Sequence, residues 1–164
     1  MLTEEEFTQT VEHYMDTIYR VALNYLRDRE TAEDVCQEVF LRLYRRAPDF
    51  DSEAHRRYWL LHVAVNECRR ALASPWRSFS SLEDVTLTAQ QAGPEEESVF
   101  RLVMELPRKY RVVLHLYYYE GYTTEEIAGL LHRRPATVRS QLDRGRKLLK
   151  QRLLEDGNDG NGSL

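Results

Sequence analysis

The sequence predicts an all-α protein of two small helical domains joined by a flexible linker, the second a helix-turn-helix, winged-helix-like but without strands. Apolar residues recur every three to four positions through most of the chain, and no segment shows the alternation of a strand. This pattern stops between residues 74 and 95, where Ser, Thr, Gln, Gly and Pro dominate. We therefore predict a first domain at 1–73, a linker at 74–95, a second domain at 96–155 and a disordered tail at 156–164.

Three helices are expected in the first domain. The first should end near Leu26, and Glu6 can complete a capping box with Thr3 at its start. The second should end near Arg46, just before Pro48, and the third at Ser74, just before Pro75. The side chains of Thr3 and Asp28 are suited to cap the first two helices, and the third should start near Ser52.

The second domain should contain four helical segments. The first includes Val99 and breaks at Pro107, and the next stops at Gly121. Thr123 and Glu126 form a second capping box, which predicts a short helix over 123–131. Proline is favoured at the first position of a helix, so Pro135 predicts that a further helix begins there after a short turn.

Charge is distributed unevenly along this chain of 164 residues, whose net charge is -4. Residues 1–73 carry ten Arg and Lys against fourteen Asp and Glu, and residues 74–98 carry one against five. Residues 99–164 carry twelve against eight, so only the last third is basic. The overall charge argues against indiscriminate nucleic-acid binding, but it leaves room for a local basic surface.

That basic surface follows the helix-turn-helix pattern. From His132 to Arg152 there are eight Arg or Lys residues and a single acid, Asp143. A solvated amphipathic helix would also show many charges. The length of the pattern and its position favour instead a recognition helix that enters the major groove of duplex DNA.

Cys36 and Cys68 fall within helical patterns and lack the spacing of zinc ligands, so we expect free thiols in a reducing compartment. No run approaches the roughly 18 apolar residues of a membrane span, and the acidic start is not that of a signal peptide. We therefore expect a soluble cytoplasmic protein with no membrane insertion and no cofactor.

An acidic stripe is expected on the second helix, where Glu30, Asp34 and Glu38 follow one another at spacings of four. It could be a solvated face relieved by Arg42, one turn after Glu38, or the docking surface of a partner. A carboxylate metal site would define an enzyme, but no His stands among these acids at ligand spacing.

The third helix mixes cations, aromatic rings and an amide. Single-stranded nucleic acid needs positive charge for its phosphates and flat surfaces on which its bases can stack. Tyr58 and Trp59 could equally be core residues, so the pattern alone leaves both interpretations open. The residues concerned are Arg56, Arg57, Tyr58, Trp59, His62, Asn66, Arg69 and Arg70.

Three segments in register, at 32–40, 58–66 and 137–142, resemble bacterial sigma factors of the extracytoplasmic-function type, in the sigma-70 family. The resemblance covers roughly Glu4 to Leu153. It implies a subunit that binds core RNA polymerase, directs it to promoter DNA and has no catalytic chemistry of its own. It also implies control by an anti-sigma factor, and docking on the polymerase through Asp34, Gln37 and Glu38.

The same resemblance implies that the third helix and the loop 71–81 hold one promoter element as a melted strand. Asn66 matches the family's base-selecting residue, while Arg69 and Arg70 should neutralise phosphates. Tyr58 and Trp59 belong to this surface, and Trp76 and Phe79 are candidate stacking residues.

The second domain would then read a more distant promoter element as duplex DNA. The family's base-contact positions fall on Arg139, Ser140, Asp143 and Arg144, and phosphate contacts are expected from Arg133, Arg134, Arg146 and Lys147. Ala136 stands where the family often has Gly. The main alternative is a dimeric helix-turn-helix transcription regulator that acts without polymerase.

Overall fold

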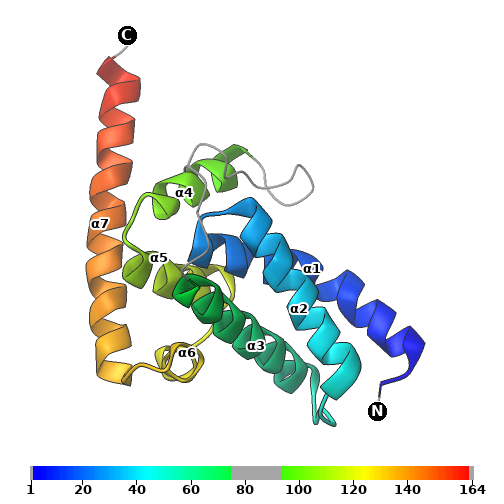
Figure 1. Ribbon diagram of the computed structural model, residues 1–164. Helices are drawn as coiled ribbons and strands as arrows, with labels where there is room; N and C mark the ends of the chain where they lie inside the picture. The colour runs from blue at the N-terminus through cyan, green and yellow to red at the C-terminus, as the bar shows by residue number, and fades with distance from the viewer. Residues whose placement is uncertain (1, 75–93, 163–164) are drawn as a thin grey trace. The chain divides into compact units, whose positions relative to one another are not determined.

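The structure is a computed structural model that describes residues 2–74 and 94–162, and these ranges contain helices but no strand. The chain divides into two compact units, Met1–Val85 and Thr86–Leu164. This division falls within the predicted linker. The two candidate stacking residues, Trp76 and Phe79, lie outside the described residues. Figure 1 shows the helices of each unit, which we describe separately.

The first unit is a bundle of three helices: α1 (Glu4–Leu26), α2 (Arg29–Arg46) and α3 (Glu53–Ala73). The side chains of Thr3 and Asp28 accept hydrogen bonds from the backbone of the first turns, as predicted, and Ser52 caps α3 in the same way. Thr3 and Glu6 form the complete capping box. Each cap satisfies backbone donors that have no partner within the helix.

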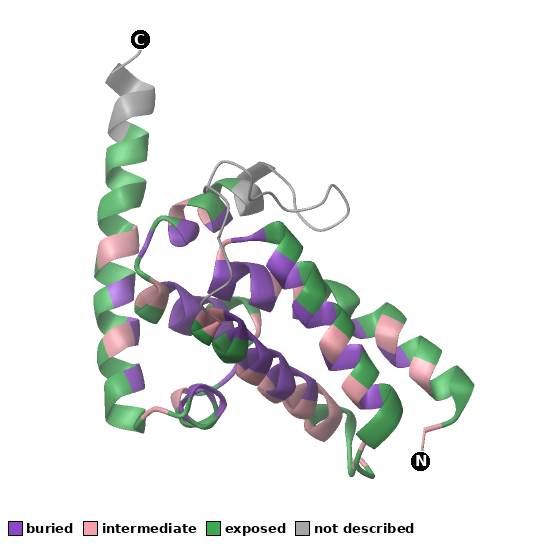
Figure 2. Ribbon diagram, in the orientation of Figure 1, coloured by how far each residue is buried: buried purple, intermediate pink, exposed green. Residues whose placement is uncertain are grey.

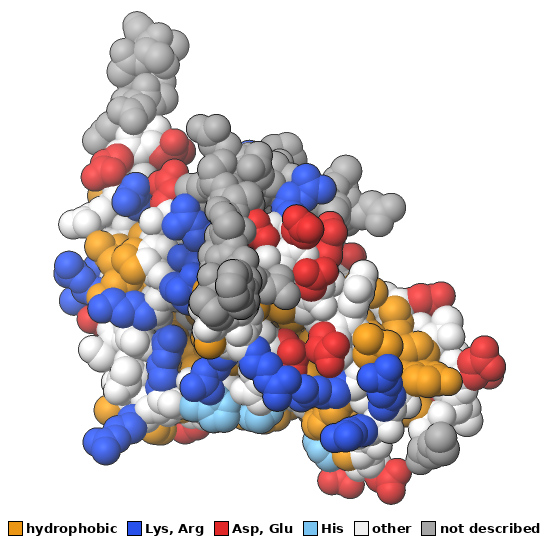
Figure 3. Space-filling view, viewed as in Figure 1, with side chains coloured by type: hydrophobic (Ala, Val, Ile, Leu, Met, Phe, Trp, Pro, Cys, Tyr) orange, Lys and Arg blue, Asp and Glu red, His pale blue; other side chains and the backbone are white. Residues whose placement is uncertain are grey.

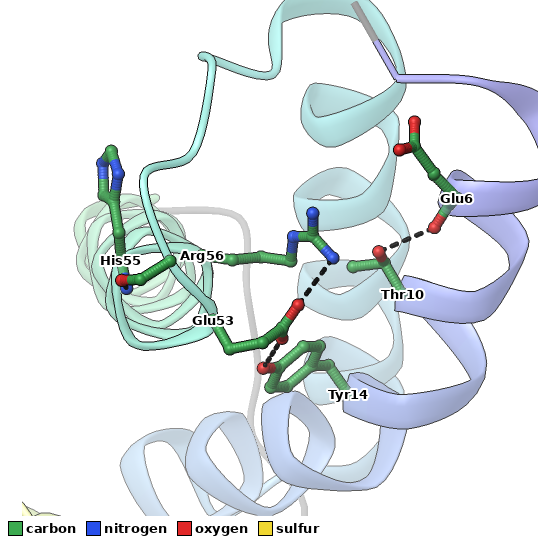
Figure 4. A network of polar contacts seen from close by, with 7 residues as sticks. Glu6, Thr10, Tyr14, Glu53, His55 and Arg56 are labelled. Atoms are coloured by element: carbon green, nitrogen blue, oxygen red, sulfur yellow. Dashed lines mark hydrogen bonds and ion pairs between the residues drawn. The ribbon is translucent and has the colours of Figure 1, made fainter.

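The core of this unit lies where the three helices meet, and Figure 2 shows their buried faces turned toward one another. Ile18 of α1, Leu43 of α2 and Leu60 of α3 are completely buried. Two hydrogen bonds to Glu53 add to this packing (Figure 4). The Tyr14 hydroxyl donates to Glu53 Oε2 at 2.8 Å, and Arg56 Nη1 donates to Glu53 Oε1 at 2.9 Å.

The Tyr14–Glu53 contact joins α1 to the first turn of α3. Burial, and then the hydrogen bond to the Glu53 carboxylate, raise the pKa of the Tyr14 hydroxyl from 10.0 to about 12. The hydroxyl therefore remains a neutral donor at physiological pH. The part of the stability that comes from this raised pKa is present below pH 10 and is lost as the pH rises toward 12.

Both cysteines are free and buried in the first unit, as the sequence predicted for the thiols. Burial raises the pKa of the Cys36 thiol from 9.0 to about 12. Since the thiolate is the nucleophile, we expect iodoacetamide to alkylate Cys36 slowly at pH 8 and rapidly once urea unfolds the chain. Peptide mass spectrometry would measure both rates, and rapid alkylation of the folded chain would contradict the expected burial.

The second unit contains α4 (Pro94–Met104), α5 (Arg108–Leu114), the π-helix η2 (His115–Tyr119), α6 (Thr124–Leu131) and α7 (Pro135–Gly162). The break at Pro107 is where the sequence predicted it, and Gly121 has a φ of 76°, a conformation that glycine adopts without strain. The π-helix was not predicted. It widens the last turn before Gly121 and carries His115, whose Nε2 lies 3.2 Å from Glu120 Oε1.

The helix-turn-helix begins at the predicted capping box of Thr123 and Glu126. α6 ends at Leu131, the next residue His132 caps it with a left-handed φ of 57°, and α7 begins at Pro135. Helix α7 continues to Gly162, past the end near 155 that its Gly- and Asn-rich composition suggested. Extending an existing helix fixes one residue for each hydrogen bond and so avoids the cost of nucleation.

Candidate nucleic-acid and partner-binding surfaces

The outer face of α3 brings together four of the residues assigned to a single strand. The rings of Tyr58 and His62 stack with centroids 6.3 Å apart, and Asn66 Nδ2 lies 3.4 Å from His62 Nδ1. Arg69 is exposed and comes seven residues after His62, about two helical turns. This face therefore offers a flat ring, an amide and a cation in a row.

Trp59 lies beside this row and is half-buried. Its ring meets Phe50 edge-on with centroids 5.7 Å apart, and the Arg56 guanidinium lies 5.3 Å from the centre of the Phe50 ring. Trp59 is thus partly packed and partly accessible. It is neither a fully buried core residue nor a fully exposed stacking surface. Phe50 was not singled out from the sequence, although an aromatic residue two positions before the helix cap Ser52 could have indicated it.

A shallow groove of about 400 Å³ lies between α2 and α3. The acidic stripe of α2 forms one wall, and the last turns of α3 form the other. Asp34 and Gln37 are exposed, and Glu38 is half-buried. The sequence suggested that Arg42 would offset the negative charge of Glu38. The guanidinium of Arg42 instead pairs with Glu67 on α3, since its Nη2 lies 2.7 Å from Glu67 Oε1. We name the docking groove by its lining residues: Asp34, Val35, Gln37, Glu38, Leu41, Glu67, Arg70, Ala71 and Ser74.

Glu67 is a residue that the sequence did not reveal. Its side chain is 10% exposed and lies between Arg42 at 2.7 Å and Arg70, whose Nη1 is 3.5 Å away. A buried carboxylate needs such partners, because burial of an unpaired charge is costly. It joins α2 to α3 beneath the docking groove.

The N-terminal half of α7 presents most of the residues assigned to duplex DNA. Ser140, Asp143, Arg144 and Lys147 are exposed. Steps of three or four residues lead from Ser140 to Asp143 or Arg144 and from these to Lys147, and Figure 3 shows Lys and Arg side chains along this helix. Asp143 lies 3.1 Å from Lys147 Nζ. The acid is therefore partly neutralised on the surface where it could accept a hydrogen bond from a base.

Arg139 has one neighbour of opposite charge, since its Nη1 lies 3.7 Å from Glu125 Oε1 of α6. Both side chains are more than half exposed, so the pair is a weak surface contact that DNA can displace. Arg134 is exposed in the turn between the two helices. Both positions are compatible with the roles assigned to them.

Arg133 and Arg146 each donate hydrogen bonds to uncharged groups of the second unit. Arg133 Nη1 donates to Gln141 Oε1 at 2.8 Å and to the Lys109 carbonyl at 3.3 Å, which joins α7 to the start of α5. Arg146 donates to the Tyr118 hydroxyl at 3.4 Å, and this bond raises the pKa of Arg146. The sequence analysis assigned both arginines to phosphate contacts. In the structure each also holds parts of the second unit together.

A second groove, of about 520 Å³, lies along the exposed side of α7. Lys109 and Tyr110 of α5 form one wall, and Thr137, Ser140 and Arg144 contribute to the other. The sequence did not indicate Lys109 or Tyr110, because nothing in their spacing relates α5 to the recognition helix.

Two further findings limit the chemistry within the described part of the chain. No group of three or more His, Cys, Asp or Glu residues there could hold a metal ion, so the stripe at Glu30 to Glu38 does not close into a site. None of the helices described is both long and apolar enough to cross a membrane.

Comparison with known families identifies both units. Residues 10–78 match Sigma-70 region 2, and residues 96–149 match Sigma-70, region 4. The sigma factor SigM of Mycobacterium tuberculosis is 30% identical over 90% of this chain and 76% of its own length. The chain belongs to the extracytoplasmic-function sigma factors.

Other relatives agree with this assignment. SigW of Bacillus subtilis is 28% identical over 92% of this sigma factor and 90% of its own length. The probable sigma factor RfaY of Xanthomonas campestris is 30% identical, but the chain spans only 41% of its length.

Two solved structures share the fold. The sigma factor RpoE of Bartonella quintana, in complex with the anti-sigma factor NepR, matches with a TM-score of 0.70 over 91% of this chain and 97% of its own, at 18% identity. CnrH, in complex with the cytosolic domain of CnrY, matches with a TM-score of 0.65 over 94% of this chain and 91% of its own, at 21% identity. At these identities the likeness concerns the fold alone.

Proposed function

We propose that this sigma factor binds core RNA polymerase through α2, holds a melted promoter element on α3 and reads a second element as duplex DNA with α7. The observation that carries the proposal is the presence of both sigma regions, in order, on one chain with separate compact units. It acts in the cytoplasm as a specificity subunit, and the polymerase supplies the catalysis.

The polymerase-binding residues are Asp34, Gln37 and Glu38. They line the docking groove from α2, and the carboxylates of Asp34 and Glu38 suit a partner with basic side chains. An anti-sigma factor would silence the protein by covering this surface or α7. Support for this comes from the two structural relatives, RpoE and CnrH, which were solved with NepR and with CnrY.

Gel filtration with core RNA polymerase tests the proposal. We expect the wild-type chain to co-migrate with the polymerase, and the double variant Gln37→Ala, Glu38→Ala to lose this co-migration. The matched control is Glu4→Ala, Glu5→Ala, which removes two exposed side chains from α1 of the same unit. If the wild type fails to bind but forms a dimer with tight affinity for duplex DNA, the polymerase-independent regulator is the better explanation.

Asn66→Ala should reduce selectivity for the melted element. Loss of the amide removes hydrogen bonds to one base and should cost roughly 1–3 kcal/mol, or about 5- to 150-fold in discrimination at that position. Binding of holoenzyme to fork-junction DNA carrying each of the four bases would measure it. Glu12→Ala, exposed on α1, is the control, and unchanged discrimination by Asn66→Ala would remove this residue from the base-reading site.

Arg139→Ala should weaken recognition of the duplex element at a single base pair, by roughly 1–3 kcal/mol. A phosphate contact would instead weaken binding to all sequences alike, which is the result we expect for Arg134→Ala. Competition assays with a set of single-base-pair substitutions distinguish the two patterns. A uniform loss for Arg139→Ala would reassign it to the phosphate backbone.

A further inference from the structure

The docking groove contains one cation that the sequence had grouped with the DNA-binding residues. Arg69 and Arg70 are adjacent and both exposed, and the sequence alone does not show which surface each one faces. Successive residues of a helix point about 100° apart. The structure places Arg70 on the wall of the docking groove, opposite the acidic stripe of α2.

Arg69 belongs to a different face of α3. It follows His62 by seven residues and Asn66 by three, so it continues the row of Tyr58, His62 and Asn66. Arg70 instead follows Glu67 by three residues, and its Nη1 lies 3.5 Å from Glu67 Oε1. The two arginines therefore serve two surfaces.

From this geometry we propose that Arg70 is a polymerase contact, and that the polymerase surface extends from α2 across the docking groove to the end of α3. This inference rests on the proposed function, because it names a further residue of the polymerase-binding surface.

The charge of the docking groove favours a protein segment over a nucleic-acid strand. A phosphate placed near Arg70 would also approach the carboxylates of Asp34, Glu38 and Glu67. Like charges brought together at an interface suppress binding. A protein segment avoids this conflict, since it can present basic side chains to α2 and a carboxylate to Arg70.

Arg70 is available for such a contact. Its side chain is 71% exposed, and its 3.5 Å contact with Glu67 is longer than the 2.7 Å contact that Glu67 makes with Arg42, so Arg70 can exchange Glu67 for another partner. Glu67 would keep its shorter contact with Arg42 at 2.7 Å and so would not be left unpaired. Leu41, which is 43% exposed, adds an apolar contact within the same groove.

Paired substitutions of the two arginines in the full chain test the proposal. Fluorescence anisotropy would give the affinity for core polymerase, and fork-junction DNA would give the strand affinity of the assembled holoenzyme. We expect Arg70→Ala to weaken polymerase binding at least 5-fold and Arg70→Glu more strongly, with strand affinity within 2-fold of wild type. Arg70→Lys, which keeps the charge, should restore most of the polymerase affinity.

Arg69→Ala should give the opposite pattern, with the loss in strand binding, and Arg101→Ala, exposed on α4, is the neutral control. If Arg70→Ala leaves polymerase affinity unchanged, the proposal is wrong. The proposed function would still be tested separately by the Gln37→Ala, Glu38→Ala double variant. If both affinities fall and Arg70→Lys restores neither, the role of Arg70 is structural and the proposal also fails. Failure of the wild type to bind polymerase would instead overturn the proposed function.

Discussion

Replacing Leu43 with alanine should lower the free energy of unfolding of the first unit by about 2–5 kcal/mol. Leu43 is completely buried on α2, where it faces the core of the three-helix bundle. The substitution removes apolar contacts and leaves a cavity that the packed helices can close only in part. A domain with a typical stability of about 5–15 kcal/mol would then be partly unfolded at moderate temperature.

Leu41 provides the matched control, since it lies two residues away on the same helix and is 43% exposed. Leu41→Ala should change the unfolding free energy by less than about 0.5 kcal/mol. Urea titration followed by tryptophan fluorescence reports on the first unit, because Trp59 is half-buried on α3 of that unit. Equal destabilisation by the two variants would contradict the assignment of Leu43 to the core.

The helix boundaries could be predicted because they depend on neighbouring residues. Thr3, Asp28, Ser52 and Thr123 each accept a hydrogen bond from a backbone N–H three residues further on, and that spacing is visible in the sequence. The π-helix at His115–Tyr119 could not be predicted in this way. It depends on how the segment packs within the second unit, and its composition gives no local sign of it.

The candidate sites show the same limit. Charge and spacing were enough to place Ser140 and Arg144 on an exposed face of α7. They could not show that Arg133 contacts the Lys109 carbonyl, 24 residues earlier in the chain, or that Glu67 is buried between two arginines. These contacts join different helices, so only the packed structure reveals which charges remain available to DNA or to polymerase.

At Gly145, α7 packs tightly against α5, and a larger residue there should separate the two helices. A Cβ atom at this position would lie 3.2 Å from Leu114 Cγ and 3.3 Å from Tyr110 Cβ. Gly145→Leu adds three more carbons to this contact, and overpacking of this kind typically costs about 1–3 kcal/mol, occasionally more. The gain in helix propensity, at most about 1 kcal/mol, offsets only part of this cost.

Because α7 carries the residues that we propose read duplex DNA, Gly145→Leu should reduce duplex DNA binding at least tenfold while polymerase binding through the first unit remains. Gly157→Leu is the matched control on the same helix, since a Cβ there would meet nothing within 4 Å and the variant gains helix propensity without a clash. Thermal unfolding followed by circular dichroism, together with duplex binding by holoenzyme, would compare the two. If Gly145→Leu bound duplex DNA as well as Gly157→Leu, the α5–α7 contact would not be what positions the recognition helix.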